Sequence, residues 1–318
     1  MRYLVTGGAG FIGSSLVREL AGQGHEVRVL DDMSRGNPAR LSGVDCEIAY
    51  GDVRDPGAVT RAMQGCDRVA HLAYLQGTQT FYANPRQVLD VALRGILNVL
   101  DACERTGCAD LLLVSSSEAY QVAPMVPTPE NVPLVVPDPL NARYSYGGGK
   151  IASELAALAW EREGVLDRLI IARPHNIYGP DMGREHVIPE FCIRMNKLDA
   201  RYPDGPIPFP IQGTGQETRS FCYIADCVDQ LVMLLDNAMP GIWHVGTMDE
   251  RTIADVAHAV AQRYFRQIKI EPGSLPKGSP PRRLPDTAKI NELFVDGAHL
   301  TDFETGVART VDWYRAHG

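Results

Sequence analysis

Tyr146 and Lys150 are the two residues of this sequence whose types and spacing most directly suggest chemistry. Four positions apart, they lie on one face of a helix, where a cationic lysine favours the phenolate form of a nearby tyrosine. A phenolate can accept a proton from a substrate hydroxyl while a hydride leaves the adjoining carbon. Ser116 follows the apolar run Leu111–Ser115 and could bond the same hydroxyl. Alone, this spacing usually marks a solvated pair, so its meaning depends on the rest of the chain.

A glycine motif stands far upstream of this pair. It runs from Gly7 to Gly13 as Gly-Gly-Ala-Gly-Phe-Ile-Gly, between an apolar stretch and a helical one. Gly7 can make the tight turn, Gly10 lets the backbone approach a pyrophosphate, and Gly13 allows close packing of the helix. Free N–H groups at the helix start, around Phe11 and Ile12, then face the phosphates. The motif predicts a dinucleotide site.

Acidic residues after the next two apolar runs indicate which dinucleotide. Asp31 ends the second run, 18 residues after Gly13. A carboxylate there bonds the adenosine ribose hydroxyls and repels a 2′-phosphate, which favours NAD over NADP even though Arg35 is near in sequence. Asp52 and Val53 follow the third run, where they would flank the adenine or form an ordinary strand-to-helix turn.

Together these motifs resemble those of the extended short-chain dehydrogenase/reductase family of NAD-dependent nucleotide-sugar epimerases and dehydratases. The resemblance covers nearly the whole chain and is carried by Thr6–Gly13, His71–Ala73, Ser115–Tyr120, Tyr146–Lys150, Arg173–Pro180 and Gly215–Tyr223. It implies a tightly held NAD that is reduced and reoxidised within one turnover. It also implies a nucleotide-diphosphate sugar as substrate and a homodimer joined by a four-helix bundle.

Two positions depart from the family pattern. Ala92 stands where the family usually has an asparagine, three residues before Gly95. Gly147–Gly149 fill the interval between Tyr146 and Lys150, where relatives often have a serine before the lysine. Each glycine costs a helix about 1 kcal/mol relative to alanine. Either the start of this helix is loose, or its backbone lies close to the cofactor.

The position two residues before Tyr120 differs between reactions in the family. By this resemblance, the position holds a substrate-contacting Thr in plain 4-epimerases and a Glu base, preceded by an Asp acid, in 4,6-dehydratases. In GDP-mannose 3,5-epimerase it holds a Cys base. Here it is Glu118, preceded by Ser117, so a base is present without the usual dehydratase acid. The segment Gly183–Arg194 is similar to the 3,5-epimerase segment with a catalytic lysine, and His186 falls on that lysine.

A carboxylate and an imidazole on opposite faces of a sugar form a two-base arrangement, which requires prior oxidation at C4 to make the neighbouring C–H acidic. On this reading Glu118 and His186 are catalytic. The alternatives are a carboxylate that only bonds a sugar hydroxyl and a histidine that is structural or only contacts substrate. His175 is expected to pack behind the site.

Four residues are expected to hold the substrate, namely Ser117, Asn176, Arg219 and Arg283. By the same resemblance, Asn176 contacts the phosphates of the nucleotide sugar and the two arginines bind the diphosphate, which a planar guanidinium suits better than an ammonium. The nucleotide base is not readable from these residues.

Alternating apolar and helical stretches predict the frame that positions these groups. Buried parallel strands are expected at Tyr3–Thr6, Val27–Leu30, Cys46–Ala49, Arg68–His71, Leu111–Ser115, Leu169–Arg173 and Gly241–Val245. Helices are expected at Ser14–Gln23, Pro56–Met63, Pro85–Arg105, Tyr146–Arg162, Ile253–Arg263 and Thr305–Ala316. This is a Rossmann-type, doubly wound α/β sheet. We expect an NAD-binding domain over 1–175, with a segment returning near 216–246, and a smaller, interleaved substrate domain over 176–318, capped by a loop-rich stretch at Asn196–Gly215.

Composition excludes several classes of protein. A formal charge of −8 argues against nucleic acid as a partner, and no apolar run reaches the roughly 20 residues that span a bilayer. The N-terminus leads directly into the glycine motif and is expected to be a strand rather than a signal peptide. The seven cysteines lack nearby histidine ligands, so we expect reduced, mostly buried thiols, no metal site and a cytoplasmic protein.

The leading hypothesis is a nucleotide-sugar epimerase that works through a transient 4-keto sugar, with proton exchange at C5 or C3. A plain 4-epimerase and a dehydratase are the nearest alternatives. A net-reducing NADP enzyme is disfavoured by Asp31. A non-catalytic dinucleotide sensor is disfavoured because the chain keeps both Tyr146 and Lys150.

Overall fold

The larger half of the molecule is built on a seven-stranded sheet. The computed structural model describes residues 1–276, 278–294 and 297–317. All neighbouring strands of the sheet are parallel, in the order β11-β6-β5-β4-β1-β2-β3. Its strands are β1 (Arg2–Thr6), β2 (Glu26–Asp31), β3 (Glu47–Tyr50), β4 (Arg68–His71), β5 (Asp110–Val114), β6 (Arg168–Pro174) and β11 (Gly241–Val245).

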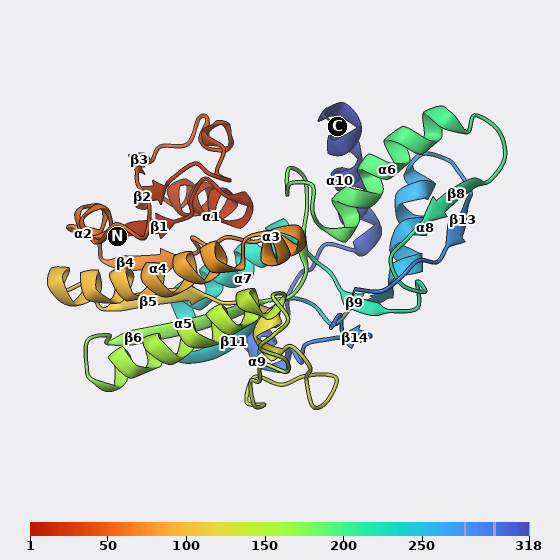
Figure 1. Ribbon diagram of the computed structural model, residues 1–318. Helices are drawn as coiled ribbons and strands as arrows, with labels where there is room; N and C mark the ends of the chain where they lie inside the picture. Colours follow the sequence, from red (N-terminus) through yellow and green to blue (C-terminus); the bar gives the residue numbers. More distant parts are fainter. Residues whose placement is uncertain (277, 295–296, 318) are drawn as a thin grey trace.

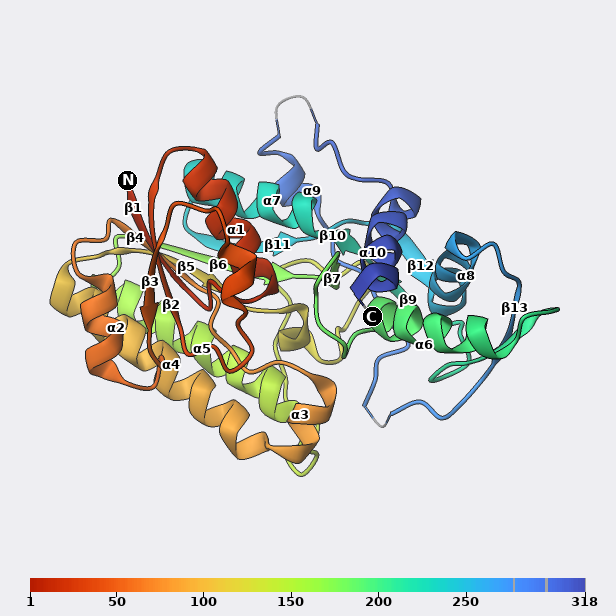
Figure 2. The ribbon, with the colours of Figure 1, turned by 90° about the horizontal axis from the view of Figure 1, so that it is seen from above.

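Helices cover both faces of this sheet, as Figure 2 shows with the sheet seen near its edge. One face packs against α1 (Phe11–Gly22) and α7 (Ile224–Asn237), and the other against α2 (Pro56–Met63), α4 (Pro85–Thr106) and α5 (Tyr144–Arg162). Because both faces are covered, the central strands are apolar throughout, as in β1, where Leu4 and Val5 point to opposite faces and are both fully buried. The predicted Rossmann-type fold is confirmed.

The smaller half lies at the far end of the sheet from the N-terminus (Figure 1). It packs α6 (Val187–Arg201), α8 (Ile253–Arg263) and α10 (Phe303–His317) against one another. Short sheets flank these helices: β8 (Ile207–Pro210) with β13 (Ile268–Glu271), and β9 (Thr218–Ser220) between β12 (Glu250–Thr252) and β14 (Arg282–Arg283). The remaining elements are β7 (Ile177–Tyr178), β10 (Cys222–Tyr223), α3 (Thr78–Ala83), α9 (Ala288–Asn291), η1 (Pro38–Leu41) and η2 (Ser117–Tyr120).

The chain passes between the two halves more than once. After β7 it enters the smaller half, and it then returns to place α7 beside α1 and to pair β11 with β6. The expected strand at Gly241–Val245 is therefore the seventh strand of the sheet.

Several expected boundaries were wrong. Asn196–Gly215 is not simply a loop-rich cap, because α6 continues to Arg201 and β8 occupies Ile207–Pro210. The prolines and glycines of this stretch lie mainly in the turns that flank β8 and so obscured the apolar face of α6. Helix α1 begins at Phe11 rather than Ser14, since the glycine turn leads directly into it.

Candidate active site

A cavity of about 370 Å³ opens where the carboxyl ends of the parallel strands meet, the usual ligand position in open α/β sheets. Every residue predicted to contact the cofactor lines it: Gly7, Gly10, Phe11, Ile12, Gly13, Asp31, Asp52, Val53, Tyr146 and Lys150. Ser116, Ser117, Glu118, Asn176, His186 and Arg283 line the same cavity. Residues from seven separate stretches of the sequence are thus brought to one place.

The glycine turn forms a cradle whose tightly packed backbone leaves no room for side chains at Gly7 and Gly13. Gly7 has a left-handed backbone, with φ of +71°, and a Cβ there would lie 2.7 Å from the nitrogen of Ala73. A Cβ on Gly13 would lie 2.1 Å from the carbonyl oxygen of Gly7. The close approach that Gly13 permits is therefore between the helix and the turn itself, and it leaves the N-terminus of α1 facing the cavity. This backbone fits a dinucleotide pyrophosphate.

Asp31 links the glycine turn to the loop after β2. Its carboxylate accepts hydrogen bonds from the backbone nitrogens of Ala9 (3.0 Å) and Met33 (2.9 Å), which tie the glycine turn to the loop after β2. A carboxylate has about four acceptor sites, so capacity for ribose hydroxyls remains. Asp52 is bound instead by the guanidinium of Arg54 at 2.6 Å, and its pKa is lowered mainly by that hydrogen bond.

Tyr146 lies deep in the cavity, stacked on Phe81 with ring centroids 4.6 Å apart. Burial raises the pKa of its phenol, while a hydrogen bond from Ser116 acts to lower it. The Nζ of Lys150 is 5.9 Å from the centre of the Tyr146 ring and donates to the carbonyl of Val114 at 2.7 Å. Burial lowers the pKa of Lys150 to about 7. Without ligands, the phenolate is therefore not favoured in the way the sequence suggested.

The glycines between Tyr146 and Lys150 have a packing reason. A Cβ on Gly147 would lie 2.5 Å from the carbonyl oxygen of Glu118, because α5 crosses closely over η2. A Cβ on Gly149 would lie 2.3 Å from the Tyr74 hydroxyl. The start of this helix is therefore not loose, because Gly147 and Gly149 pack tightly against other parts of the protein.

Glu118 faces a cluster of arginines. Its Oε1 accepts from Arg283 Nη1 at 2.6 Å and lies 3.8 Å from Arg143 Nη2. Burial acts to raise the pKa of Glu118, but the charges of Arg283, Arg143 and Arg219 outweigh it and lower the pKa to about 2. Glu118 is thus ionised at neutral pH.

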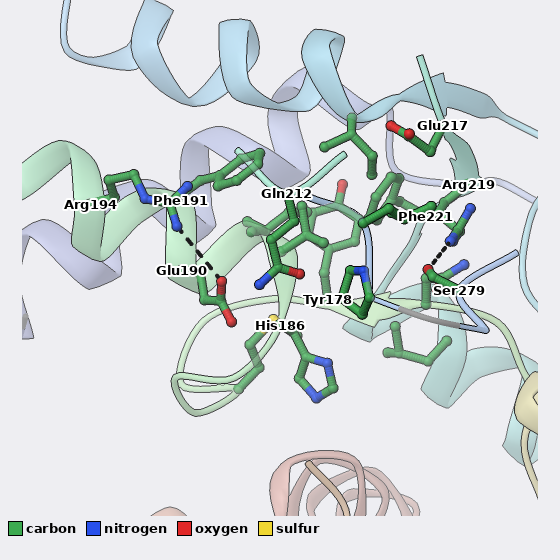
Figure 3. Close-up of a pocket in the computed structure, with 18 residues that line it drawn as sticks. Tyr178, His186, Glu190, Phe191, Arg194, Gln212, Glu217, Arg219, Phe221 and Ser279 are labelled. Atoms are coloured by element: carbon green, nitrogen blue, oxygen red, sulfur yellow. Dashed lines mark hydrogen bonds and ion pairs between the residues drawn. The ribbon is translucent and has the colours of Figure 1, made fainter. Parts of the chain in front are cut away.

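A second cavity, of about 170 Å³, adjoins the first and is shown in Figure 3. Asn176, His186 and Arg219 line it, together with Tyr178, Phe191, Phe221, Glu190 and Gln212. His186, which precedes α6, borders both cavities. Burial and the charge of Arg35 lower the pKa of His186, while the charge of Glu118 acts to raise it, so these two predicted catalytic groups are close enough to interact.

The two predicted diphosphate arginines are neighbours. Strands β9 and β14 pair in parallel with Arg219 opposite Arg283. Arg219 donates to the carbonyls of Thr218 (2.7 Å) and Pro280 (2.8 Å), and its pKa is lowered to about 10 by burial and by Arg283. Among the described residues, Arg283 Nη2 is buried without a hydrogen-bond partner. Positive charge therefore gathers where the two cavities meet.

Sequence reasoning missed several residues of the site. Arg143 lies just before α5 and carried no motif. Tyr74, directly after the His71–Ala73 motif, lines the larger cavity, and Glu190 and Gln212 line the smaller one. For Tyr74 the signal was present, since it follows a strand end that already carried the family pattern.

His175 lies outside the residues that line the two cavities. It is fully buried, with its ring 4.8 Å from that of His244 and 6.3 Å from that of Tyr120. Burial keeps its pKa well below the usual value. It packs behind the site, as expected.

The part of the chain that the structure describes contains no group of three or more histidine, cysteine or acidic side chains that could hold a metal ion. All seven cysteines are free thiols, and each is buried except Cys46, which is partly exposed. Among these same residues, no helix combines the length and apolarity that crossing a membrane requires.

Comparison with known proteins places the chain in a family. The sequence profile of the NAD dependent epimerase/dehydratase family matches residues 3–246. The chain is 32% identical over 299 residues to UDP-glucuronic acid decarboxylase 1 of Arabidopsis thaliana, covering 92% of this chain and 65% of that protein. It thus spans slightly less than two thirds of this relative.

Two solved structures are similar over nearly their full length. One is the UDP-glucose 4-epimerase of Thermus thermophilus in complex with NAD, with a TM-score of 0.85, 26% identity and 100% coverage of both chains. The other is the dTDP-glucose 4,6-dehydratase of Streptomyces venezuelae with NAD bound, with a TM-score of 0.86, 30% identity and coverage of 99% of this chain and 97% of that one. The chain belongs to the NAD-dependent epimerase/dehydratase family, and its cofactor is NAD.

Proposed function

We propose that this protein is an epimerase of nucleotide-diphosphate sugars that oxidises the sugar transiently at C4 and moves a proton at C5 or C3. The observation that carries this proposal is the shared cavity in which Tyr146 and Ser116 lie together with two further proton-transferring groups, Glu118 and His186. A plain 4-epimerase needs neither Glu118 nor His186.

The first half-reaction rests on Tyr146, Ser116 and Lys150. Bound NAD supplies a hydride acceptor that can also return the hydride. With the positive charge of bound NAD nearby, Tyr146 would ionise and take the proton of the sugar hydroxyl, and Ser116, whose hydroxyl acts to lower the pKa of the phenol, would orient that hydroxyl. Gly7, Gly10, Gly13 and Asp31 would hold the cofactor, with its adenosine end toward Asp31.

The arginines and Asn176 would hold the substrate diphosphate at the junction of the cavities. Arg143, Arg219 and Arg283 bring positive charge together beside Glu118, and guanidinium groups suit the negative oxygens of a diphosphate. The smaller cavity, bordered by Phe191 and Phe221, would then receive the nucleoside.

The second half-reaction needs a base and an acid beside the ketone. Glu118 is ionised and His186 is neutral in the absence of substrate, so either can take the proton. A bound diphosphate adds negative charge near His186, which raises its pKa and lets it return a proton. Glu118 would act first and His186 second.

A second candidate function is decarboxylation of a nucleotide-linked hexuronic acid. The low pKa of Glu118 favours it, because loss of CO₂ from the carbon beside a ketone leaves the electron pair in place and needs no strong base. The identity of 32% to a UDP-glucuronic acid decarboxylase points the same way.

Turnover in deuterated water separates these reactions. NMR of the products from a panel of nucleotide sugars and hexuronic acids would give both identity and label position. The proposal expects an inverted product with deuterium at C5 or C3. Release of CO₂ would establish the second candidate, and an unlabelled product inverted only at C4 would establish a plain 4-epimerase.

Two variants test the roles of the proposed base and acid. Glu118→Gln should abolish solvent exchange while NADH absorbance still appears on mixing with substrate, because oxidation at C4 does not need this carboxylate. His186→Asn should retain exchange but return the label to the starting isomer. A fully active Glu118→Gln variant would reduce Glu118 to a substrate contact.

We also propose a homodimer formed through α4 and α5. Leu89, Leu93 and Leu97 recur every four residues on the exposed face of α4, and Leu155 is exposed on α5 beside it. Light scattering should report a dimer that Leu93→Arg converts to monomer, whereas Met239→Arg, at an exposed position on the return segment, should not change the mass.

A further inference from the structure

Tyr74 lines the larger cavity, and neither the sequence motifs nor the proposed reaction uses it. Its ring lies beneath Lys150, with Nζ 3.9 Å from the ring centre. Its hydroxyl donates to the carbonyl oxygen of Tyr146 at 3.2 Å, and its ring meets that of Tyr146 edge-on, 5.0 Å between centroids. Tyr74 therefore contacts both members of the Tyr–Lys pair.

The two departures from the family pattern make room for this ring. A Cβ on Gly149 would lie 2.3 Å from the Tyr74 hydroxyl and 2.9 Å from the Cβ of Ala92. A longer side chain at either position would compete with Tyr74 for the same space. Ala92, Gly149 and Tyr74 thus form one packing unit around the lysine.

We propose that Tyr74 is a positioning residue that holds the Lys150 ammonium against its ring face, in a chain that has Ala92 where the family usually has an asparagine. The proposal rests on the assignment of Lys150 to the active site. It goes beyond the proposed reaction, because it concerns how this chain keeps that charge in place.

The surroundings of Lys150 show why a ring is needed. Its only hydrogen-bond partner among the described residues is the carbonyl of Val114. Glu154, one turn further along α5, acts on Lys150 through its charge but is bound by Arg173 at 2.5 Å and by Ser115. Since no carboxylate among the described residues contacts the ammonium, the groups in contact with it that offset its desolvation are the carbonyl of Val114 and the electron-rich face of Tyr74.

The other titratable neighbours do not supply negative charge. Burial and the charge of Lys150 lower the pKa of His71 to about 3, so its imidazole is neutral. Burial keeps the phenols of Tyr74 and Tyr146 protonated at neutral pH. Replacing the ring of Tyr74 by an aliphatic side chain would therefore put apolar atoms on that side of the ammonium and leave it only its hydrogen bond to Val114 among the described residues.

The lysine itself can be observed directly. The chain contains five lysines, Lys150, Lys197, Lys269, Lys277 and Lys289, so carbon-13 labelling of lysine gives a spectrum of few signals. The Lys150 signal is assigned by its loss in Lys150→Ala. It should be displaced upfield by the ring current of Tyr74, and it should titrate at lower pH than the other four.

Three variants, each titrated with NAD and after its removal, test the proposal. Tyr74→Leu should abolish the upfield displacement and raise the proton dissociation constant of Lys150 about 3- to 30-fold, as expected for loss of a cation–π contact. Tyr74→Phe keeps the ring and should keep both properties. Phe81→Leu, the matched control, removes a ring of the same cluster that stacks on Tyr146, and it should leave Lys150 unchanged.

Two further variants test the proposal in case Tyr74→Leu does not fold. Gly149→Ala should displace the Tyr74 ring and so move the Lys150 signal downfield, and Tyr74→Phe should partly reverse this, because it removes the hydroxyl that the new Cβ would meet. Equal effects of Leu and Phe at position 74, or an unchanged Lys150 signal in both Tyr74→Leu and Gly149→Ala, would overturn the proposal. Neither result depends on which sugar the enzyme uses.

Discussion

The two cavities of the site are built by different means. The larger one is shaped by backbone, because Gly7 and Gly13 let the turn and the helix start pack closely against neighbouring backbone. The smaller one and its border with the larger are shaped by charged side chains, above all Arg219 and Arg283 on paired strands. A cavity made by backbone tolerates almost no added atom. In a cavity made by long side chains, each substitution removes only part of the affinity for the ligand. The two regions should therefore respond differently to substitution.

The largest effect is expected at Tyr146, which lines the larger cavity. Tyr146→Phe should lower kcat about 10²- to 10⁴-fold, the usual contribution of a general acid–base group. Calorimetry should find NAD and nucleotide-sugar binding nearly unchanged, because the phenol holds neither the pyrophosphate nor the diphosphate. Activity within about tenfold of the parent would remove Tyr146 from its role.

Next in size is a substitution in the backbone cradle. Gly13→Ala places a Cβ 2.1 Å from the Gly7 oxygen, a clash with backbone that cannot rotate away. Overpacking costs about 1–3 kcal/mol, and at the upper end NAD binding should weaken about 100-fold by calorimetry.

Gly22→Ala is the matched control for this variant. Gly22 ends the same helix, and a Cβ there meets nothing within 4 Å. Equal NAD affinity in the two variants would break the comparison, since it would mean that the cradle is not what holds the cofactor.

A smaller effect is expected on the charged side. Arg219→Ala should raise KM about 10- to 100-fold with little change in kcat, because a lost charge-assisted hydrogen bond costs about 1.5–3 kcal/mol. The KM of Arg219→Lys should lie between those of the wild type and Arg219→Ala, since an ammonium keeps the charge but not the planar fork. Steady-state kinetics with NAD in excess would measure both, and an unchanged KM in Arg219→Ala would place this arginine outside the substrate site.

The smallest effect is on stability, and it depends on pH. The pKa of Glu118 in the folded protein, about 2, lies below its ordinary value of 4.5, so its ion pairs stabilise the fold above pH 4.5 and that contribution is lost as the pH falls toward 2. The loss of stability in Glu118→Gln, measured by urea unfolding, should therefore be largest near neutral pH and shrink below pH 4.5.

The exposed variant Glu292→Gln provides the baseline for this measurement. A difference between wild type and Glu118→Gln that stayed constant from pH 7 to pH 3 would show that the arginine cluster does not stabilise the carboxylate.

Local sequence patterns were enough to predict the residues that line the larger cavity. The glycine turn, Asp31 at a strand end and the four-residue spacing of Tyr146 and Lys150 depend on contacts within a few residues or on one strand–turn–helix unit. Local units of this kind can be recognised in a single sequence, and they were sufficient to predict the parallel sheet and the NAD cofactor.

Tertiary structure alone decided the rest. Arg219 and Arg283 are 64 residues apart and become neighbours only because β9 and β14 pair. Arg143 and Glu118 meet because α5 packs on η2, and Tyr74 reaches Lys150 because Ala92 and Gly149 leave space for its ring. Strand pairing and helix packing join residues that no sequence period relates, so the low pKa of Glu118 and the surroundings of Lys150 are properties of the folded chain and not of any motif within it.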